Sequence, residues 1–125
     1  LSNTIIENGV KLDNHIQIGH NVHVGAHTAI AACTAIAGSV RIGKNCMIGG
    51  NTGIAGHLEL ADRVIITGMS RVTGSIHQAG VYSSGSPIQP NNEWRKNSVR
   101  MRQLDDLARK VKSMEKVLSN ISARE

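Results

Sequence analysis

The sequence predicts an all-β solenoid, a parallel β-helix of six-residue repeats, followed by a C-terminal α-helical tail. The first observation is a branched aliphatic residue at every sixth position from residue 6 to residue 72. The second is a near absence of aromatic residues, since the chain has one Trp, one Tyr, no Phe and 13 glycines. The third is a change of pattern after Ile76, where the period of six ends. The length of 125 residues suits one domain.

The β-helix is predicted over residues 1–77. The residue after each aliphatic is mostly small, and the residue two before it is small or β-branched. Helices repeat at 3.6 residues and strands at 2, so neither gives a period of six. A β-helix does, because each short side needs one inward aliphatic and each corner needs a small residue. The aliphatic positions are Ile6, Leu12, Ile18, Val24, Ile30, Ile36, Ile42, Ile48, Ile54, Leu60, Ile66 and Val72.

The rest of the chain divides into a connector and a tail. Residues 78–90 are rich in Gly, Ser and Pro, which predicts a connector loop. Residues 91–125 predict a helical tail, with Asn91 or Asn92 as N-cap and Glu93 in the first turn. Six apolar residues then step by three and four, as in a seam that packs against other tails or on the repeat. These residues are Leu104, Leu107, Val111, Met114, Leu118 and Ile121.

Positive charge collects in the tail. Residues 91–125 hold nine Lys/Arg against five Asp/Glu, out of a net charge of +5 for the chain. Arg95, Lys96, Arg100 and Arg102 lie within eight residues without an acidic residue among them. Such a run is either a solvated surface or a docking site for an acidic partner. We expect no nucleic-acid partner, because the patch is short.

The cysteines, the apolar runs and the first residue indicate where the protein is located and whether the chain is a fragment. Cys33 and Cys46 are thirteen residues apart, and with no signal peptide we interpret them as reduced cytosolic thiols. No apolar run approaches the 18 residues of a membrane span. Because the first residue is Leu1, we expect the chain to be a fragment of a longer protein.

The repeat over residues 4–77 resembles that of the hexapeptide-repeat acyltransferases. The shared pattern is an aliphatic, a small residue, two variable positions, a small residue and another variable one. The resemblance implies triangular coils of 18 residues wound left-handed, against the usual rule for crossovers. It also implies a homotrimer, because about four coils bury little apolar surface in one chain.

Two histidines stand out against this frame. His20 is the second residue after Ile18 and His57 the third after Ile54, so they are two coils and one residue apart. At strand spacing they lie on nearly the same face, roughly 10 Å apart along the axis. Gly38 is one coil above His20 and leaves an N–H beside the imidazole. A base with a pKa near neutrality beside an oxyanion donor suits acyl transfer. The other histidines, including His23, are interpreted as surface residues.

Five ordered segments resemble one branch of the family, the UDP-3-O-(3-hydroxyacyl)glucosamine N-acyltransferases of lipid A biosynthesis. They are "KLDNHIQIGHNVHVG", "AIAACTAIAGS", "IGGNTGIAGHLEL", "VIITGMSRVTGSI" and "GVYSSGSPIQPNNEWRK". The resemblance implies transfer of a 3-hydroxyacyl chain from acyl carrier protein to the 2-amino group of a UDP-3-O-acylglucosamine. It further implies a C-terminal fragment of a cytoplasmic enzyme from a Gram-negative bacterium. No cofactor is expected beyond the phosphopantetheine that carries the acyl group.

The same resemblance assigns roles to four residues. His20 in "IGHNV" matches the general base, and His57 in "AGHLEL" matches a histidine that holds or polarises the thioester. Gly38 offers the oxyanion N–H. Asp13 in "LDN" is a candidate to orient a histidine, although it belongs to another corner and would need a neighbouring chain; the alternative is a corner turn residue. The basic run from Arg95 to Arg102 is then a docking site for the acidic carrier protein.

One departure from the family pattern and two rival functions remain open. Arg71 stands where relatives have an apolar residue, so it either lines the acyl channel or is a solvated charge. Such enzymes carry an N-terminal nucleotide-binding domain, and we expect this chain to lack much of the nucleotide site, because no Phe or Tyr lies within the repeats to stack on a base. The rivals are a metal-dependent enzyme using His15, His20 and His57 across a subunit boundary, although no metal is our expectation, and a catalytically silent trimerisation scaffold.

Overall fold

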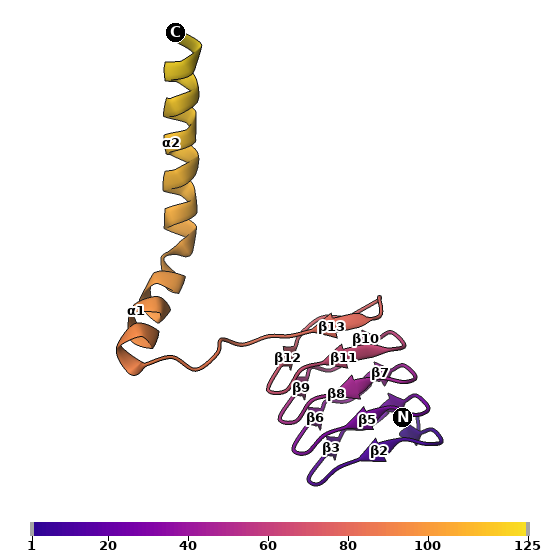
Figure 1. Cartoon of the computed structure of the whole chain (residues 1–125). Coiled ribbons are helices and arrows are strands. Elements are labelled where there is room, and N and C mark those ends of the chain that lie inside the picture. The colour runs from indigo at the N-terminus through magenta and orange to yellow at the C-terminus, as the bar shows by residue number, and fades with distance from the viewer. Residues whose placement is uncertain (1, 125) are drawn as a thin grey trace. The chain divides into compact units, whose positions relative to one another are not determined.

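The computed structural model describes residues 2–124, which divide into two units between Ser86 and Pro87. The first unit is a parallel β-solenoid, coloured from indigo to pink in Figure 1. The second is a pair of helices. The predicted fold class of a β-solenoid followed by a helical tail is therefore confirmed.

The strands are short, and most have two residues. Their bounds are β1 Ile5–Ile6, β2 Lys11–Leu12, β3 Gln17–Ile18, β4 His23–Val24, β5 Ala29–Ile30, β6 Ala35–Ile36, β7 Arg41–Ile42, β8 Met47–Ile48, β9 Gly53–Ile54, β10 Glu59–Leu60, β11 Val64–Ile66, β12 Arg71–Val72 and β13 Gly80–Tyr82.

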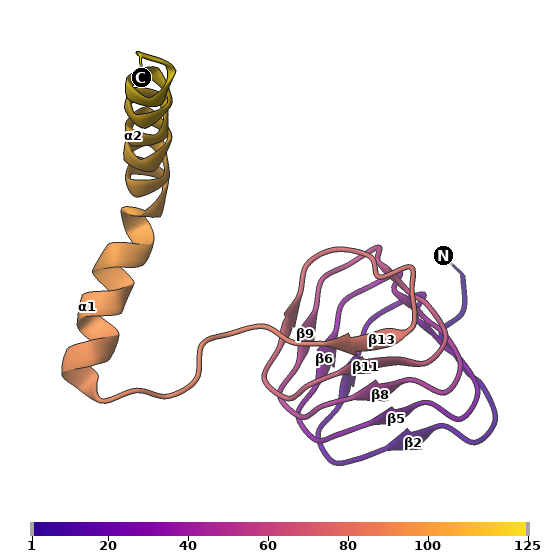
Figure 2. The same ribbon diagram turned by 45° about the horizontal axis from the view of Figure 1, so that its top comes forward.

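Three parallel sheets form the sides of the solenoid. Sheet A has the strand order β1-β4-β7-β10, sheet B has β13-β11-β8-β5-β2, and sheet C has β12-β9-β6-β3. From β1 to β12, partners in neighbouring coils are 18 residues apart, as Val24 pairs with Ile42 and Ile42 with Leu60, whereas β11 and β13 pair residues 16 apart. Figure 2 shows the stacked coils with sheet B along one side and β6 and β9 along another. Three six-residue repeats therefore make one coil.

The core consists of two columns of inward side chains. One is the predicted aliphatic column, in which Val24 is fully buried and Ile36 is 1% exposed. The other lies two residues earlier in each repeat and includes the fully buried Val22, Thr28 and Cys46. Two of the buried threonines bond across the coils, since Thr28 Oγ1 donates to the carbonyl of Gly43 at 2.8 Å and Thr34 Oγ1 to that of Gly49 at 3.0 Å. Small and β-branched residues thus fill a core too narrow for aromatic rings.

Ten corners, those that follow Leu12 to Ile66, are closed by a residue in the left-handed region of φ. These residues stand three positions after the aliphatic, with φ between 53° and 62°: His15, Asn21, His27, Cys33, Ser39, Asn45, Asn51, His57, Arg63 and Met69. Asn and His are enriched among non-glycine residues that adopt this conformation. Six of these ten positions hold Asn or His, which tolerate the left-handed backbone. The period of six alone did not reveal this preference.

The end of the solenoid differs from the predicted boundary. The connector was predicted over residues 78–90, but β13 lies inside that range and pairs in parallel with β11. Tyr82 is partly buried and packs against the core, and its hydroxyl donates to the carbonyl of Gln78 at 2.8 Å. The Gly- and Ser-rich composition hid a strand because β13 has only three residues, one of them Gly80.

The second unit contains α1, Asn91–Arg102, and α2, Leu104–Arg124. Glu93 lies in the first turn of α1 as predicted, but the N-cap is Pro90 and not Asn91 or Asn92, and no side chain caps the helix. Proline at this position disfavours helical backbone at the residue before it, so the helix begins after Pro90. All six seam residues are exposed in the chain, from 46% at Val111 to 64% at Met114. Neither helix has the length and apolar character needed to cross a membrane.

Candidate functional site

The corner between sheets C and A brings together three of the predicted site residues. It consists of residues 19–22, 37–40, 55–58 and 73–75, and is called the His20 corner below. The Ser39 N–H donates to the His20 carbonyl at 2.8 Å, and the His57 N–H donates to the Gly38 carbonyl at 3.0 Å. His20, Gly38 and His57 therefore stand on three successive coils along one edge of the solenoid.

The imidazole of His20 lies over Gly38. A Cβ atom at residue 38 would stand 2.5 Å from Cε1 and 2.8 Å from Cδ2 of the ring, closer than real Cβ contacts come. Only glycine leaves room for the ring in this position. His20 is exposed and Gly38 is half-buried, so one edge of the imidazole remains accessible from solvent.

The N–H of Gly38 is available to a ligand. Among residues 2–124, this N–H donates to neither a backbone nor a side-chain acceptor. A backbone N–H held on a rigid coil beside an imidazole is the arrangement that stabilises the oxyanion of a tetrahedral intermediate. The corner can therefore offer a base and an anion donor a few ångströms apart.

His57 differs from His20 in its backbone. It occupies the left-handed corner position with φ 62°, like His15 and His27, whereas His20 precedes such a position. Its side chain is exposed. The left-handed backbone is enough to explain a histidine at residue 57. It does not explain the histidine at residue 20, which lies outside that position.

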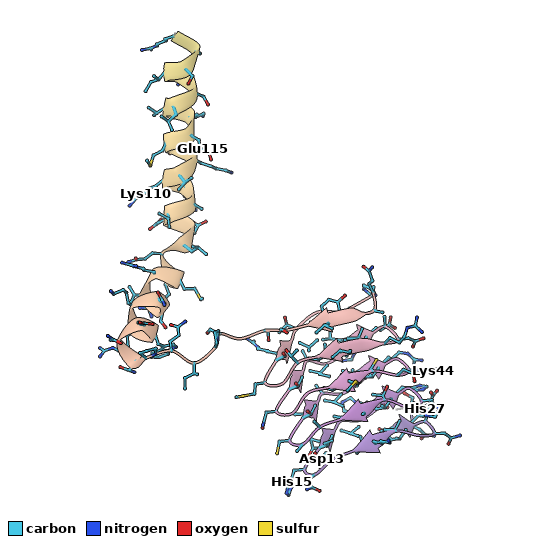
Figure 3. The ribbon with its side chains drawn as sticks, in the orientation of Figure 1. Asp13, His15, His27, Lys44, Lys110 and Glu115 are labelled. Atoms are coloured by element: carbon cyan, nitrogen blue, oxygen red, sulfur yellow. The ribbon has the colours of Figure 1, made fainter. Side chains whose placement is uncertain are left out.

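Asp13 and His15 lie on a different corner. Both follow β2 at the corner between sheets B and C, and Figure 3 shows them together at the base of the solenoid. Asp13 Oδ1 accepts the N–H of Asn14 at 2.8 Å, the local role that a turn residue would have. One chain therefore does not bring Asp13 to His20. Within the described part of the chain, no group of three or more His, Cys, Asp or Glu residues is arranged to hold a metal ion.

His23 has a partner that the sequence interpretation missed. Its Nε2 lies 2.9 Å from Glu7 Oε1, and the other carboxylate oxygen accepts the N–H of Ala26 at 2.6 Å. These two hydrogen bonds, His23 first, lower the pKa of Glu7 below its ordinary value. The signal was present, because Glu7 holds a repeat position that is mostly small.

Two shallow grooves lie over the two sheets that meet at the His20 corner. One, of about 410 Å³, lies over sheet A and is lined by both signs of charge, including Arg41, Lys44 and Glu59. The other, of about 400 Å³, lies over sheet C, where the outward residues Ala35 and Gly53 are small. Arg71 on β12 stands at one end of the second groove.

The predicted docking residues Arg95, Lys96, Arg100 and Arg102 all lie on α1 and are exposed. Two of them, Arg100 and Arg102, are in its last turn, where a cation is favourable. Cys33 is an exposed free thiol and Cys46 a buried one, and burial raises the pKa of the Cys46 thiol.

Comparison with known proteins gives partial matches of high identity. The chain is 55% identical over 59 residues to a UDP-3-O-acylglucosamine N-acyltransferase of Pseudomonas fluorescens, and 54% identical over 57 residues to one of Chromohalobacter salexigens. A Pseudomonas aeruginosa relative of the same name is 53% identical over 60 residues. These matches cover 46–48% of this chain but only 16–17% of each relative. They confirm the resemblance over the matched residues.

Other comparisons are weaker. No family model matches the chain. A serine acetyltransferase of Entamoeba histolytica aligns with 71% of this chain and 41% of its own, at a TM-score of 0.36 and 18% identity. The acetyltransferase domain of PglB from Neisseria gonorrhoeae aligns with 70% of this chain and 57% of its own, at a TM-score of 0.25 and 14% identity.

Proposed function

We propose that the chain carries the catalytic corner of an N-acyltransferase. In this proposal a 3-hydroxyacyl group moves from acyl carrier protein to the 2-amino group of a UDP-3-O-acylglucosamine, in lipid A biosynthesis. The observation that carries the proposal is the combination of relatives named for this substrate with an imidazole packed on a glycine N–H at one corner. The matches cover only 16–17% of each relative.

The chemistry follows from the two groups at the corner. The amine nitrogen attacks the thioester carbonyl and loses a proton to His20, whose imidazole acts as the general base. The carbonyl oxygen becomes an oxyanion, and the Gly38 N–H stabilises it. The C–S bond then breaks, and the imidazolium returns the proton to the thiolate. The products are an amide and the free thiol of the carrier.

His57 and the groove over sheet C position the acyl donor in this proposal. His57 stands one coil beyond Gly38 on the same corner, within reach of the thioester. The small side chains of Ala35 and Gly53 leave space for an acyl chain, and a charged Arg71 at the end of the groove limits its length. No cofactor takes part other than the phosphopantetheine of the carrier.

A homotrimer completes the site. The outer face of sheet B exposes apolar side chains on three strands: Met47 is 57% exposed, Ile65 36% and Val81 66%. Burying such a face against another copy is favourable. Asp13 of a neighbouring chain would then approach His20, which Asp13 of the same chain does not reach. The apolar seam of α2 would pack against the seams of the other two copies.

Carrier-protein docking belongs to α1. Its four cations are exposed and free to meet an acidic surface, with Trp94 beside them at 51% exposure. Complementary charge mainly accelerates association and makes binding sensitive to salt. We place the assembled protein in the cytoplasm of a Gram-negative bacterium, where acyl carrier protein and the nucleotide sugar are found.

The test is acyl transfer by a chimera in which this chain replaces the segment that it matches in the P. fluorescens relative. Product formation from 3-hydroxyacyl carrier protein and UDP-3-O-acylglucosamine is followed by mass spectrometry. We expect turnover that depends on His20. A chimera that sediments as a trimer and binds both substrates but forms no amide would contradict the proposal and favour a silent scaffold.

A further inference from the structure

The side chain of Asn21 contacts the imidazole of His20 directly. Asn21 Nδ2 lies 3.1 Å from Nδ1 of His20. Asn21 closes the corner with φ 56° and is half-buried, whereas its histidine neighbour is exposed. The amide is therefore fixed by the coil while the ring that it touches faces solvent. This contact plays no part in the mechanism above.

The orientation of this amide determines which ring nitrogen is the base. An amide NH₂ can only donate, so with Nδ2 toward the ring, Nδ1 accepts and the proton of the neutral imidazole sits on Nε2. With the amide turned by 180°, Oδ1 accepts a proton from Nδ1, and Nε2 carries the free lone pair. Nε2 is the ring atom nearest the position that a Cβ of residue 38 would take. Only the turned amide presents the base beside the Gly38 N–H.

A second observation favours the turned amide. In the orientation with Nδ2 toward the ring, Asn21 Oδ1 is buried and has no hydrogen-bond partner among residues 2–124. A buried oxygen without a donor is unfavourable. The oxygen and nitrogen of an amide are nearly equal in size, so the hydrogen bonds decide between the two orientations. Turning the amide gives Oδ1 the Nδ1–H of His20 as its donor and moves Nδ2 to the buried position.

We propose that Asn21 is the positioning residue of His20. Its Oδ1 accepts the Nδ1–H, fixes the ring over Gly38 and leaves Nε2 as the base. The same bond stays in place when Nε2 takes a proton, because the imidazolium still donates from Nδ1. An Asn21 that donated through Nδ2 would have to turn before His20 could be protonated. The kinetic consequence of this inference rests on the proposed acyl transfer, but the hydrogen bond itself does not.

On the coils directly below and above His20, the described corner residues are uncharged. Thr4 on the coil below donates to the Gly19 carbonyl at 3.3 Å, and Gly38 and Ser39 stack above; none of these ionises. His57 is the titratable group further along the same corner. On the adjoining sheet A, the imidazole of His23 is hydrogen-bonded to the carboxylate of Glu7.

The test reads the tautomer of His20 in the purified chain. Long-range proton–nitrogen NMR correlations above pH 8 distinguish Nδ1–H from Nε2–H in a neutral imidazole. We expect Nδ1–H for His20. Dominance of the Nε2–H tautomer would overturn the proposal, since it would mean that Asn21 donates.

Two variants separate the positioning role from a structural one. Asn21→Asp keeps an acceptor and removes the donor, so we expect the Nδ1–H tautomer to persist and the pKa of His20 to rise by about one unit or more. Asn21→Gly keeps the left-handed backbone without the amide, so the tautomer preference is lost. Loss of the His20–residue 21 bond in Asn21→Asp, with an unchanged titration of His20, would also overturn the proposal.

Asn45→Gly is the matched control. Asn45 has the same corner position and φ 56°, but lies on another corner, after sheet A. This variant tests the loss of an Asn from a left-handed corner without touching His20, so His20 signals should be unchanged. In the chimera, Asn21→Gly should lower kcat about tenfold or more at unchanged KM, and Asn21→Asp should restore activity and shift the acid limb of the pH profile. An inactive chimera with the expected tautomer would contradict the acyl-transfer proposal but leave this inference standing.

Discussion

The imidazole of His20 occupies the space over Gly38 that any larger side chain at residue 38 would fill. The two residues are 18 apart, one coil of the solenoid, so the register of the coils sets their contact. The coil that holds Gly38 is rigid because neighbouring strands pair on both sides of it. The predictions below begin from this relationship.

Gly38→Ala should lower acyl transfer by the chimera by about a hundredfold, because the methyl group displaces the imidazole from its position beside the N–H. Gly74→Ala is the matched control, since Gly74 has the same position on the His20 corner and nothing lies within 4 Å of a Cβ there. The measurement is the steady-state rate of acyl transfer by the two variants of the chimera. Equal activities would mean that the His20–Gly38 contact is not part of the site.

His57→Asn should lower acyl transfer by about 10–1,000-fold, if its imidazole polarises the thioester as proposed. Asparagine tolerates the left-handed φ of 62°, so the corner should keep its shape. His27→Asn makes the same exchange at another corner with φ 61° and should leave kcat/KM unchanged. A loss of equal size in both variants would point to a defect of folding.

Thr28→Val should destabilise the solenoid by about 1–3 kcal/mol, because its hydroxyl donates to the Gly43 carbonyl and accepts the Cys46 N–H at 3.1 Å. Thr52→Val should be neutral or stabilising, since Thr52 Oγ1 is buried without a partner in residues 2–124. Urea unfolding of the chain followed by circular dichroism compares the two. An equal loss in both would contradict the assigned hydrogen bonds.

Glu7→Gln should destabilise the chain at pH 7 but not in strong acid. The folded-state pKa of Glu7 lies below the ordinary value, so its ionised form contributes stability above that ordinary value. This stability is lost as the pH falls through the lowered folded-state pKa. Unfolding curves at pH 7 and pH 3 should therefore differ more for the wild type than for the variant. Glu59→Gln, at an exposed glutamate on β10, should change neither curve beyond the general effect of charge.

Replacing Arg95, Lys96, Arg100 and Arg102 by Gln should abolish salt-sensitive binding of 3-hydroxyacyl carrier protein to the purified chain. Changing Lys110, Lys112, Lys116 and Arg124 on α2 removes the same charge from another exposed surface and should leave most of the binding intact. Analytical ultracentrifugation at low and moderate salt gives affinity and stoichiometry together. Equal losses from both variants would indicate an effect of net charge alone.

Much of the fold was predictable because one physical constraint repeats. A narrow core accepts one branched aliphatic per side, so Ile36, Ile42 and Ile48 mark the coil period without any long-range information. The spacing likewise predicted that His20, Gly38 and His57 share a corner. Contacts that depend on side-chain direction were not predictable. The contact of Asn21 with His20, and that of His23 with Glu7, join side chains whose orientation a period of six does not specify.

The left-handed corner position explains another limit of the sequence. It favours Asn and His for backbone reasons, so a histidine such as His15 or His27 carries no signal of chemistry by its presence. His20 stands outside that position, and its packing against Gly38 is what distinguishes it. Strand β13 was missed for a different reason, because three residues are too few for a pattern.

The most direct test of the account is acyl transfer by the His20→Ala chimera with and without added imidazole. If His20 is the base, the variant should lose activity at least a hundredfold, and free imidazole entering the space over Gly38 should restore part of it. His27→Asn, assayed beside it, should be as active as the unmodified chimera. Full activity of His20→Ala without imidazole would contradict the central claim that this corner carries out the transfer.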